Sequence, residues 1–156
     1  PWVAPLLAAA APEARLLFLV RDPVERFRNG MSRITETRVA NDGVAVSDVI
    51  DGGFYAFQLR RLRQFFPAER ILVLQFERCI ADADGQLAAT YRFLGLDSNY
   101  RPTRWVPPAS PDVPPLDDSV VDRLSELYAE DAGNLAALVP DFDLDRWPAF
   151  RRRPLR

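Results

Sequence analysis

The chain has 156 residues and a formal net charge of −2, and its mixture of 48% hydrophobic and 27% charged residues is ordinary for one globular domain. It contains no His, no Lys and a single Cys, which excludes a Ser-His-Asp triad, a His- or Cys-based metal site, an internal disulfide and a Walker-type lysine. All 20 basic residues are therefore Arg, and the weak negative charge argues against a general nucleic-acid binder.

The N-terminal half contains three apolar segments, and two of them are typical of strands. Residues 1–11 are apolar but lack the basic flank of a signal peptide, and no run reaches the about 20 residues that cross a bilayer. The runs at 15–20 and 70–76 are typical of strands buried on both faces, as in a parallel sheet. Two strands alone make a poor sheet, so we expect further strands upstream of this chain or within residues 1–11.

Helical patterns lie between these two strands. A helix is predicted to begin with Asp22 as the N-cap, Pro23 at its first position and Glu25 at capping-box spacing. Its apolar stripe consists of Val24, Phe27, Met31 and Ile34. The polar, Gly-containing residues 36–52 predict a loop, and a second helix is predicted from about residue 54 to 66.

The C-terminal half is mainly helical in pattern. A helix is predicted over 82–94, with Gly95 as its C-terminal stop, and the Pro-rich residues 97–115 predict an irregular surface loop. A last helix is predicted over 118–138, and residues 141–150 are expected to pack against the core. The positions expected to face inward on the last helix are Val121, Leu124, Leu127, Tyr128, Leu135 and Leu138. This alternation of strands and helices predicts a single α/β domain over residues 1–156, with a parallel sheet flanked by helices.

Arg21 is the residue with the clearest chemical signal. It follows a predicted buried strand and precedes a helix, so we expect it at the carboxyl edge of the sheet, where open α/β sheets bind ligands. Its guanidinium offers a planar fork of donors that fits phosphate, and Asn29 can present an amide to the same anion. The alternative is structural, because an Arg after a strand is often the ion-pair partner of a nearby carboxylate.

Five stretches carry a wider pattern, and they follow one another along most of the chain. They are LVRDPVER at 19–26, GFYAFQL at 53–59, FPAERILVLQFE at 66–77, FLGL at 93–96 and LYAEDAGNL at 127–135, with Trp147 beyond. In this order they resemble the sulfotransferases that use 3'-phosphoadenosine-5'-phosphosulfate (PAPS), including bacterial members and the heparan sulfate sulfotransferases. The resemblance implies a P-loop-NTPase-like sheet and transfer of a sulfuryl group to a hydroxyl or amine.

The resemblance also implies roles for individual residues. Arg21 matches the family Arg that contacts the 3'-phosphate of the nucleotide, and Asn29 stands where the family usually has Ser. Arg101 and Arg104 lie in the segment that corresponds to a basic, nucleotide-contacting loop. The implied co-substrate is PAPS, the product is 3'-phosphoadenosine-5'-phosphate (PAP), and the acceptor is a carbohydrate or small molecule. No metal is implied, and no catalytic base is assigned.

One family feature is absent from the sequence. The Gly-rich loop that holds the 5'-phosphosulfate should precede the first strand, but residues 1–14 contain no Gly, Lys, Ser or Thr. We therefore expect the C-terminal part of a longer enzyme, cytoplasmic and inactive by itself. A degenerate, non-catalytic binding module is the alternative. A different P-loop-related enzyme, such as a kinase, stays open because Glu77 ends the second strand.

Overall fold

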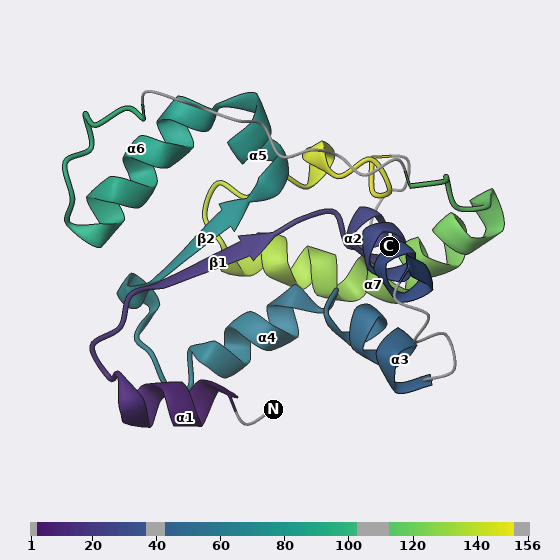
Figure 1. Cartoon of the computed structure of the whole chain (residues 1–156), viewed down its shortest axis with the longest axis horizontal. Coiled ribbons are helices and arrows are strands. Elements are labelled where there is room, and N and C mark those ends of the chain that lie inside the picture. Colours follow the sequence, from purple (N-terminus) through teal and green to yellow (C-terminus); the bar gives the residue numbers. More distant parts are fainter. Residues whose placement is uncertain (1–2, 37–42, 103–112, 152–156) are drawn as a thin grey trace. The chain divides into compact units, whose positions relative to one another are not determined.

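The computed structural model describes residues 3–36, 43–102 and 113–151 (Figure 1). In chain order its elements are α1 (Val3–Ala10), β1 (Leu16–Val20), α2 (Pro23–Glu36), α3 (Gly43–Asp51), α4 (Tyr55–Leu62), the 3₁₀ helix η1 (Ala68–Arg70), β2 (Ile71–Gln75), α5 (Phe76–Ala81), α6 (Ala83–Leu94), α7 (Asp118–Leu138) and the 3₁₀ helix η2 (Leu144–Arg146). Both predicted strands and the three principal predicted helices around Asp22, Gly95 and Tyr128 are confirmed.

β1 and β2 lie side by side as a parallel pair, and they form the sheet of the described chain (Figure 1). Their register runs from Leu16 opposite Ile71 to Val20 opposite Gln75. Parallel neighbours need a long crossover connection, which the helices between the two strands provide. The predicted α/β class with a parallel sheet is confirmed, and the sheet is small.

The prediction that both faces of the strands are buried is wrong for one face of β1. Leu17 and Leu19 are 46% and 55% exposed, whereas Val20 at the end of the strand is 1% exposed. Successive strand residues point to opposite faces, so the exposed pair belongs to one face. The helices that pack against this small sheet leave those two side chains in contact with solvent.

Three parts of the secondary structure differ from the sequence prediction. Residues 3–10 form helix α1, so they do not add a strand to the sheet. The segment predicted as a loop over 36–52 contains α3, whose Val49 packs within van der Waals distance of Gly30 on α2. The α3 sequence contains three Val residues and a Gly, so its helix propensity is weak. Tertiary packing outweighs this weak propensity. A separate short helix, α5, also precedes α6.

Helix ends follow the capping chemistry that the sequence predicts. The N-cap of α6 is Asp82, whose carboxylate accepts the Gly85 N–H at 3.0 Å, and its C-cap is Gly95 in the left-handed conformation with φ 78°. The α4 helix ends at Leu62, four residues earlier than predicted, and hydrogen-bonded turns continue the chain to Phe66. Of the Pro-rich segment 97–115, the described parts have neither helix nor strand, and residues 103–112 lie outside the described ranges.

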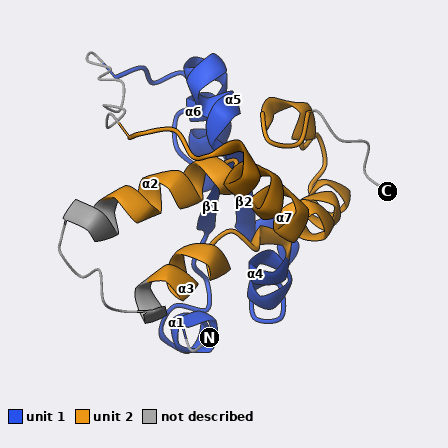
Figure 2. Ribbon diagram, turned by 90° about the vertical axis from the view of Figure 1, so that its right-hand side faces the viewer, with its two compact units in different colours: residues 1–20, 57–107 blue, residues 21–56, 108–156 orange. Residues whose placement is uncertain are grey.

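The chain divides into two compact units, residues 1–20 with 57–107 and residues 21–56 with 108–156 (Figure 2). We call them unit 1 and unit 2. Unit 1 contains the sheet with α1, α5 and α6, and its most buried side chains include Leu59 and Phe66. Unit 2 contains α2, α3 and α7 and is centred on Trp147 and Tyr128, both fully buried. The expectation of a single domain over 1–156 stays a prediction.

α7 packs along one face, mostly as predicted. Leu124, Tyr128 and Leu135 are buried, as the helical spacing indicates. Leu127 is 47% exposed, so the prediction that it points inward is wrong. The buried stripe instead includes the small side chains of Ser125 and Ala132, which a pattern based on large apolar residues overlooks.

Candidate anion-binding site

Arg21 lies at the junction between β1 and α2. It follows Val20, the last residue of β1, and belongs to unit 2 together with α2. Its backbone N–H donates to the Tyr55 hydroxyl with an N–O distance of 3.4 Å. Its side chain is 33% exposed. The backbone of Arg21 is therefore held by a buried aromatic residue, while part of its guanidinium-bearing side chain reaches solvent.

Asp22 is the N-cap of α2, as predicted. Its Oδ1 accepts the Val24 N–H at 2.9 Å and the Glu25 N–H at 3.4 Å. Its Oδ2 accepts the Ala149 N–H at 3.2 Å, from a segment 127 residues away in the chain. Asp22 is only 1% exposed, so its charge is buried and offset by these three donors.

Glu25 links two of the arginines near the start of α2. Its Oε2 lies 2.7 Å from Nη2 of Arg28 and 3.7 Å from Nη2 of Arg21. The shorter pair is with Arg28, so Glu25 is neutralised mainly there. The structural alternative, an ion pair between Arg21 and a neighbouring carboxylate, is thus present as a long contact. A pair this exposed is worth at most about 1 kcal/mol.

Asn29 lies about one turn beyond Glu25 on the same helix. Its amide nitrogen donates to the Glu25 carbonyl at 2.7 Å, in the i to i−4 pattern of a side chain bonding to its own helix. The amide carries two N–H donors, so one is used within α2. Arg21 and Asn29 therefore lie in the same unit, with Glu25 contacting both: its carboxylate lies near Arg21 and its carbonyl accepts from Asn29.

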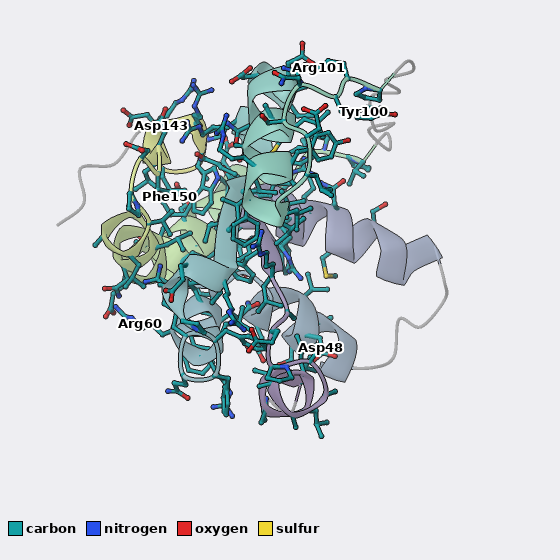
Figure 3. The ribbon with its side chains drawn as sticks, turned by 90° about the vertical axis from the view of Figure 1, so that its left-hand side faces the viewer. Asp48, Arg60, Tyr100, Arg101, Asp143 and Phe150 are labelled. Atoms are coloured by element: carbon teal, nitrogen blue, oxygen red, sulfur yellow. The ribbon has the colours of Figure 1, made fainter. Side chains whose placement is uncertain are left out.

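The observed contacts of Arg101 are with residues of its own unit. Arg101 belongs to unit 1, on the segment after α6 that Figure 3 shows together with Tyr100. Its Nη1 donates to the Ser98 and Tyr100 carbonyls at 2.9 and 3.0 Å, and its Nε lies 4.0 Å from Oδ1 of Asp84. Arg104 lies outside the described residues.

A pocket of about 440 Å³ adjoins Arg101 within unit 1. Its walls are mainly apolar and come from α5, α6 and the segment after α6, and they are formed by Cys79, Ala83, Asp84, Gln86, Leu87, Thr90, Arg101 and Pro102. Burial raises the pKa of the Cys79 thiol, and the nearby Glu77 carboxylate raises it further. A raised pKa keeps the sulfur protonated at neutral pH, so Cys79 lacks the thiolate character of a nucleophile.

A set of polar side chains in unit 2 stabilises the turn between α3 and α4. Nη1 of Arg26 donates to the Val49 carbonyl and the Tyr128 hydroxyl donates to the Ile50 carbonyl, both at 2.9 Å. Oδ2 of Asp131 accepts the Ala56 N–H, also at 2.9 Å, at the start of α4. Desolvation raises the pKa of Tyr128 to about 12, so its hydroxyl keeps its proton. These contacts satisfy backbone groups at the helix ends that would otherwise need water.

Gly52 and Gly53 allow this close approach. A Cβ atom on Gly53 would lie 2.6 Å from a ring carbon of Tyr128, and one on Gly52 would overlap the Arg26 guanidinium. The sequence contains the glycines and the LYAEDAGNL stretch, but no local pattern predicts the contacts between them. The only signal was the placement of Tyr128 and Asp131 three residues apart, on neighbouring positions of one helix face.

Two kinds of feature are missing from the part of the chain that the structure describes. No group of three or more Cys, Asp or Glu side chains there is placed to hold a metal ion. Among the same residues, none of the helices has the length and apolar character that a membrane crossing requires.

Comparison with known proteins identifies the family. A sequence profile described as the sulfotransferase family matches residues 2–100, which include Arg21 and Asn29. The crystal structure of a sulfotransferase from Alicyclobacillus acidocaldarius is similar in fold, with a TM-score of 0.72 and 22% sequence identity. The match covers 92% of this chain and 61% of that one, and no curated protein matches significantly. The resemblance drawn from the five sequence stretches is thereby confirmed at the level of the family, and the chain belongs to the sulfotransferase family.

Proposed function

We propose that this chain supplies the 3'-phosphate-binding part of a PAPS-dependent sulfotransferase that acts on a hydroxyl or amine acceptor. The observation that carries the proposal is the position of Arg21, which directly follows a parallel strand and precedes a capped helix within the region matched by the family profile. Open α/β sheets bind their ligands at the carboxyl ends of strands.

The charges around Arg21 support binding of an anion. Residues 21–28 contain three arginines against two carboxylates, Asp22 and Glu25, so the segment has a formal charge of +1. Asp22 is buried and accepts three N–H donors, while Glu25 pairs closely with Arg28. Arg21 can therefore exchange its 3.7 Å contact with Glu25 for two shorter, charge-assisted hydrogen bonds to a phosphate dianion.

The reaction follows from the chemistry of PAPS. The acceptor oxygen or nitrogen attacks the sulfur, the bond from sulfur to the bridging phosphate oxygen breaks, and PAP leaves with the bonding electrons. A general base takes the acceptor proton, and positive groups stabilise the negative charge that develops on the leaving phosphate. Arg21 acts on the far end of the nucleotide, so its role is binding and positioning. Asn29, Arg101 and Arg104 are proposed as further nucleotide contacts.

Isothermal titration calorimetry with PAP and with AMP tests the proposal, because AMP lacks the 3'-phosphate. We expect the chain to bind PAP more tightly than AMP. We expect Arg21→Ala to weaken PAP binding by ~1.5–3 kcal/mol, the range for a hydrogen bond to a charged group, with little effect on AMP. Arg78→Ala, which removes an Arg after the other strand, is the matched control. Equal affinity of the unaltered chain for the two nucleotides would contradict the proposal.

A non-catalytic binding module is the second candidate. Asn29 favours it, because Asn29 stands where the family usually has Ser and its amide donates to the Glu25 carbonyl within α2. We propose that this chain alone binds PAP but transfers no sulfuryl group. A transfer assay with labelled PAPS and a set of hydroxyl and amine acceptors checks this. Measurable turnover by the chain alone would assign it a complete catalytic site.

A further inference from the structure

Residues 147–150, which we call the C-terminal segment, are bonded to Asp22 at the start of α2, within unit 2. Trp147 is fully buried, and its ring centroid lies 5.0 Å from that of Phe142 and 5.7 Å from that of Phe150. The Phe150 N–H donates to the Trp147 carbonyl at 2.9 Å, which closes a turn around Ala149. This segment lies beyond the residues 2–100 matched by the family profile, and Figure 3 marks it by Phe150.

The two carboxylate oxygens of Asp22 join the start of α2 to the C-terminal segment 147–150. Oδ1 caps α2 by accepting the Val24 and Glu25 N–H groups, and Oδ2 accepts the Ala149 N–H at 3.2 Å. An N-cap needs only one acceptor oxygen. The second oxygen accepts from Ala149 instead, and it thereby joins the C-terminal turn to Asp22, the residue that follows Arg21.

Tyr55 makes a second connection between the same two parts. Its hydroxyl accepts the Arg21 N–H at 3.4 Å, and its ring centroid lies 6.0 Å from that of Trp147. Tyr55 is 4% exposed. Arg21 is thus held at its own N–H through Tyr55 and at the next residue through Asp22, and both connections lead to the turn at 147–150.

We propose that Asp22 is a positioning residue for Arg21, and that it acts by fixing the C-terminal turn against the start of α2. This inference rests on the proposed function, in which Arg21 holds the nucleotide 3'-phosphate. If the Arg21 backbone is fixed before binding, it loses less conformational freedom when the phosphate binds. A fixed backbone also holds the Arg21 guanidinium where its N–H groups can reach the phosphate oxygens. The carboxylate itself does not touch the nucleotide.

The test measures the ratio of PAP affinity to AMP affinity in Asp22→Asn. The Asn oxygen can still cap Val24, but the amide nitrogen then faces the Ala149 N–H, so a donor meets a donor. We expect the ratio to fall about tenfold, which corresponds to about 1.4 kcal/mol, while AMP affinity stays within about twofold. General loss of structure would weaken binding of both nucleotides and leave the ratio unchanged.

Two further variants keep the test decisive. Tyr55→Phe preserves the buried ring and removes only the hydroxyl that accepts the Arg21 N–H, and we expect a fall in the ratio of about threefold. If Asp22→Asn does not fold, the Tyr55→Phe variant alone tests the proposal. Asp143→Asn is the matched control, because Asp143 (labelled in Figure 3) is a half-exposed carboxylate preceding η2 that pairs with Arg146 at 3.0 Å.

The outcomes separate the two proposals. If the unaltered chain shows no preference for PAP over AMP, the proposed function fails. If it shows that preference and loses it in Arg21→Ala, but Tyr55→Phe and any folded Asp22→Asn protein keep the full ratio, the role of Asp22 is overturned. A fall in Asp22→Asn and Tyr55→Phe with no change in Asp143→Asn supports it.

Discussion

Each of the two strands is followed closely by a helix, but the two junctions are built differently. After β1, the carboxylate of Asp22 is buried and accepts three N–H groups, one of them from the C-terminal segment. After β2, Gln75 occupies the N-cap position, is also buried and makes no side-chain cap bond to α5. The helices that follow have 14 and 6 residues.

We infer from this difference that the end of a strand alone does not make a binding site. A helix of one or two turns adds little aligned backbone dipole, whereas a longer helix with a proline at its first position and a capped end presents an ordered first turn. Asp22 at the start of α2 also accepts a hydrogen bond from the distant residue Ala149. We therefore propose the anion site at Arg21, and not at the arginine after β2.

Trp147→Ala is the most severe test of the distant support. Removing a fully buried Trp from contact with Tyr55, Phe142 and Phe150 should lower the free energy of unfolding by about 3–5 kcal/mol, measured by urea denaturation. Leu127→Ala is the control, because that side chain is 47% exposed and should cost far less. Equal losses in the two variants would show that the C-terminal turn does not stabilise the junction.

A comparison of two caps sharpens the difference further. Asp22→Ala removes a cap and leaves the Ala149 N–H without its acceptor, so we expect a loss of about 2–4 kcal/mol in unfolding free energy. Asp82→Ala removes an exposed cap with one bond to Gly85, and the expected loss is about 1 kcal/mol. Thermal unfolding followed by circular dichroism measures both. A larger effect at Asp82 would reverse the comparison.

The smallest expected effect concerns the competing carboxylate at the site. Glu25→Gln removes the 3.7 Å contact with Arg21 and raises the formal charge of the segment by one. PAP affinity should rise about two- to threefold, in keeping with the modest energy of exposed ion pairs. The gain should shrink at high salt, because screening weakens the extra charge. Weaker PAP binding in this variant would indicate that Glu25 orients Arg21 productively.

Much of the fold could be predicted because local signals and tertiary structure agree. Asp22, Pro23 and Gly95 marked helix ends whose capping chemistry is local, and the apolar runs marked both strands. The helix α3 could not be predicted in this way, because its β-branched residues favour it only when they pack against α2. Helix α1 was missed because an apolar segment of that length does not show its period.

The site was predictable only in part, for the same physical reason. Arg21 and the Asp22 cap follow from neighbours in sequence, and the structure places both at the strand end. The hydrogen bonds from Ala149 to Asp22 and from Ala56 to Asp131 join residues 127 and 75 positions apart, so no local pattern contains them. The roles of Asn29, Arg101 and Arg104 stay predictions, since the contacts of the first two are with their own neighbourhoods and the third lies outside the described residues.

The most direct test of the central claim observes the Arg21 side chain itself while nucleotide is added. Proton–nitrogen NMR of arginine Nε–H groups, assigned with Arg21→Ala, follows each guanidinium during titration with PAP and with AMP. We predict a saturable shift of the Arg21 resonance with PAP and a much smaller one with AMP. A response confined to other arginines, such as Arg101, with the Arg21 signal unchanged at saturating PAP, would contradict the account.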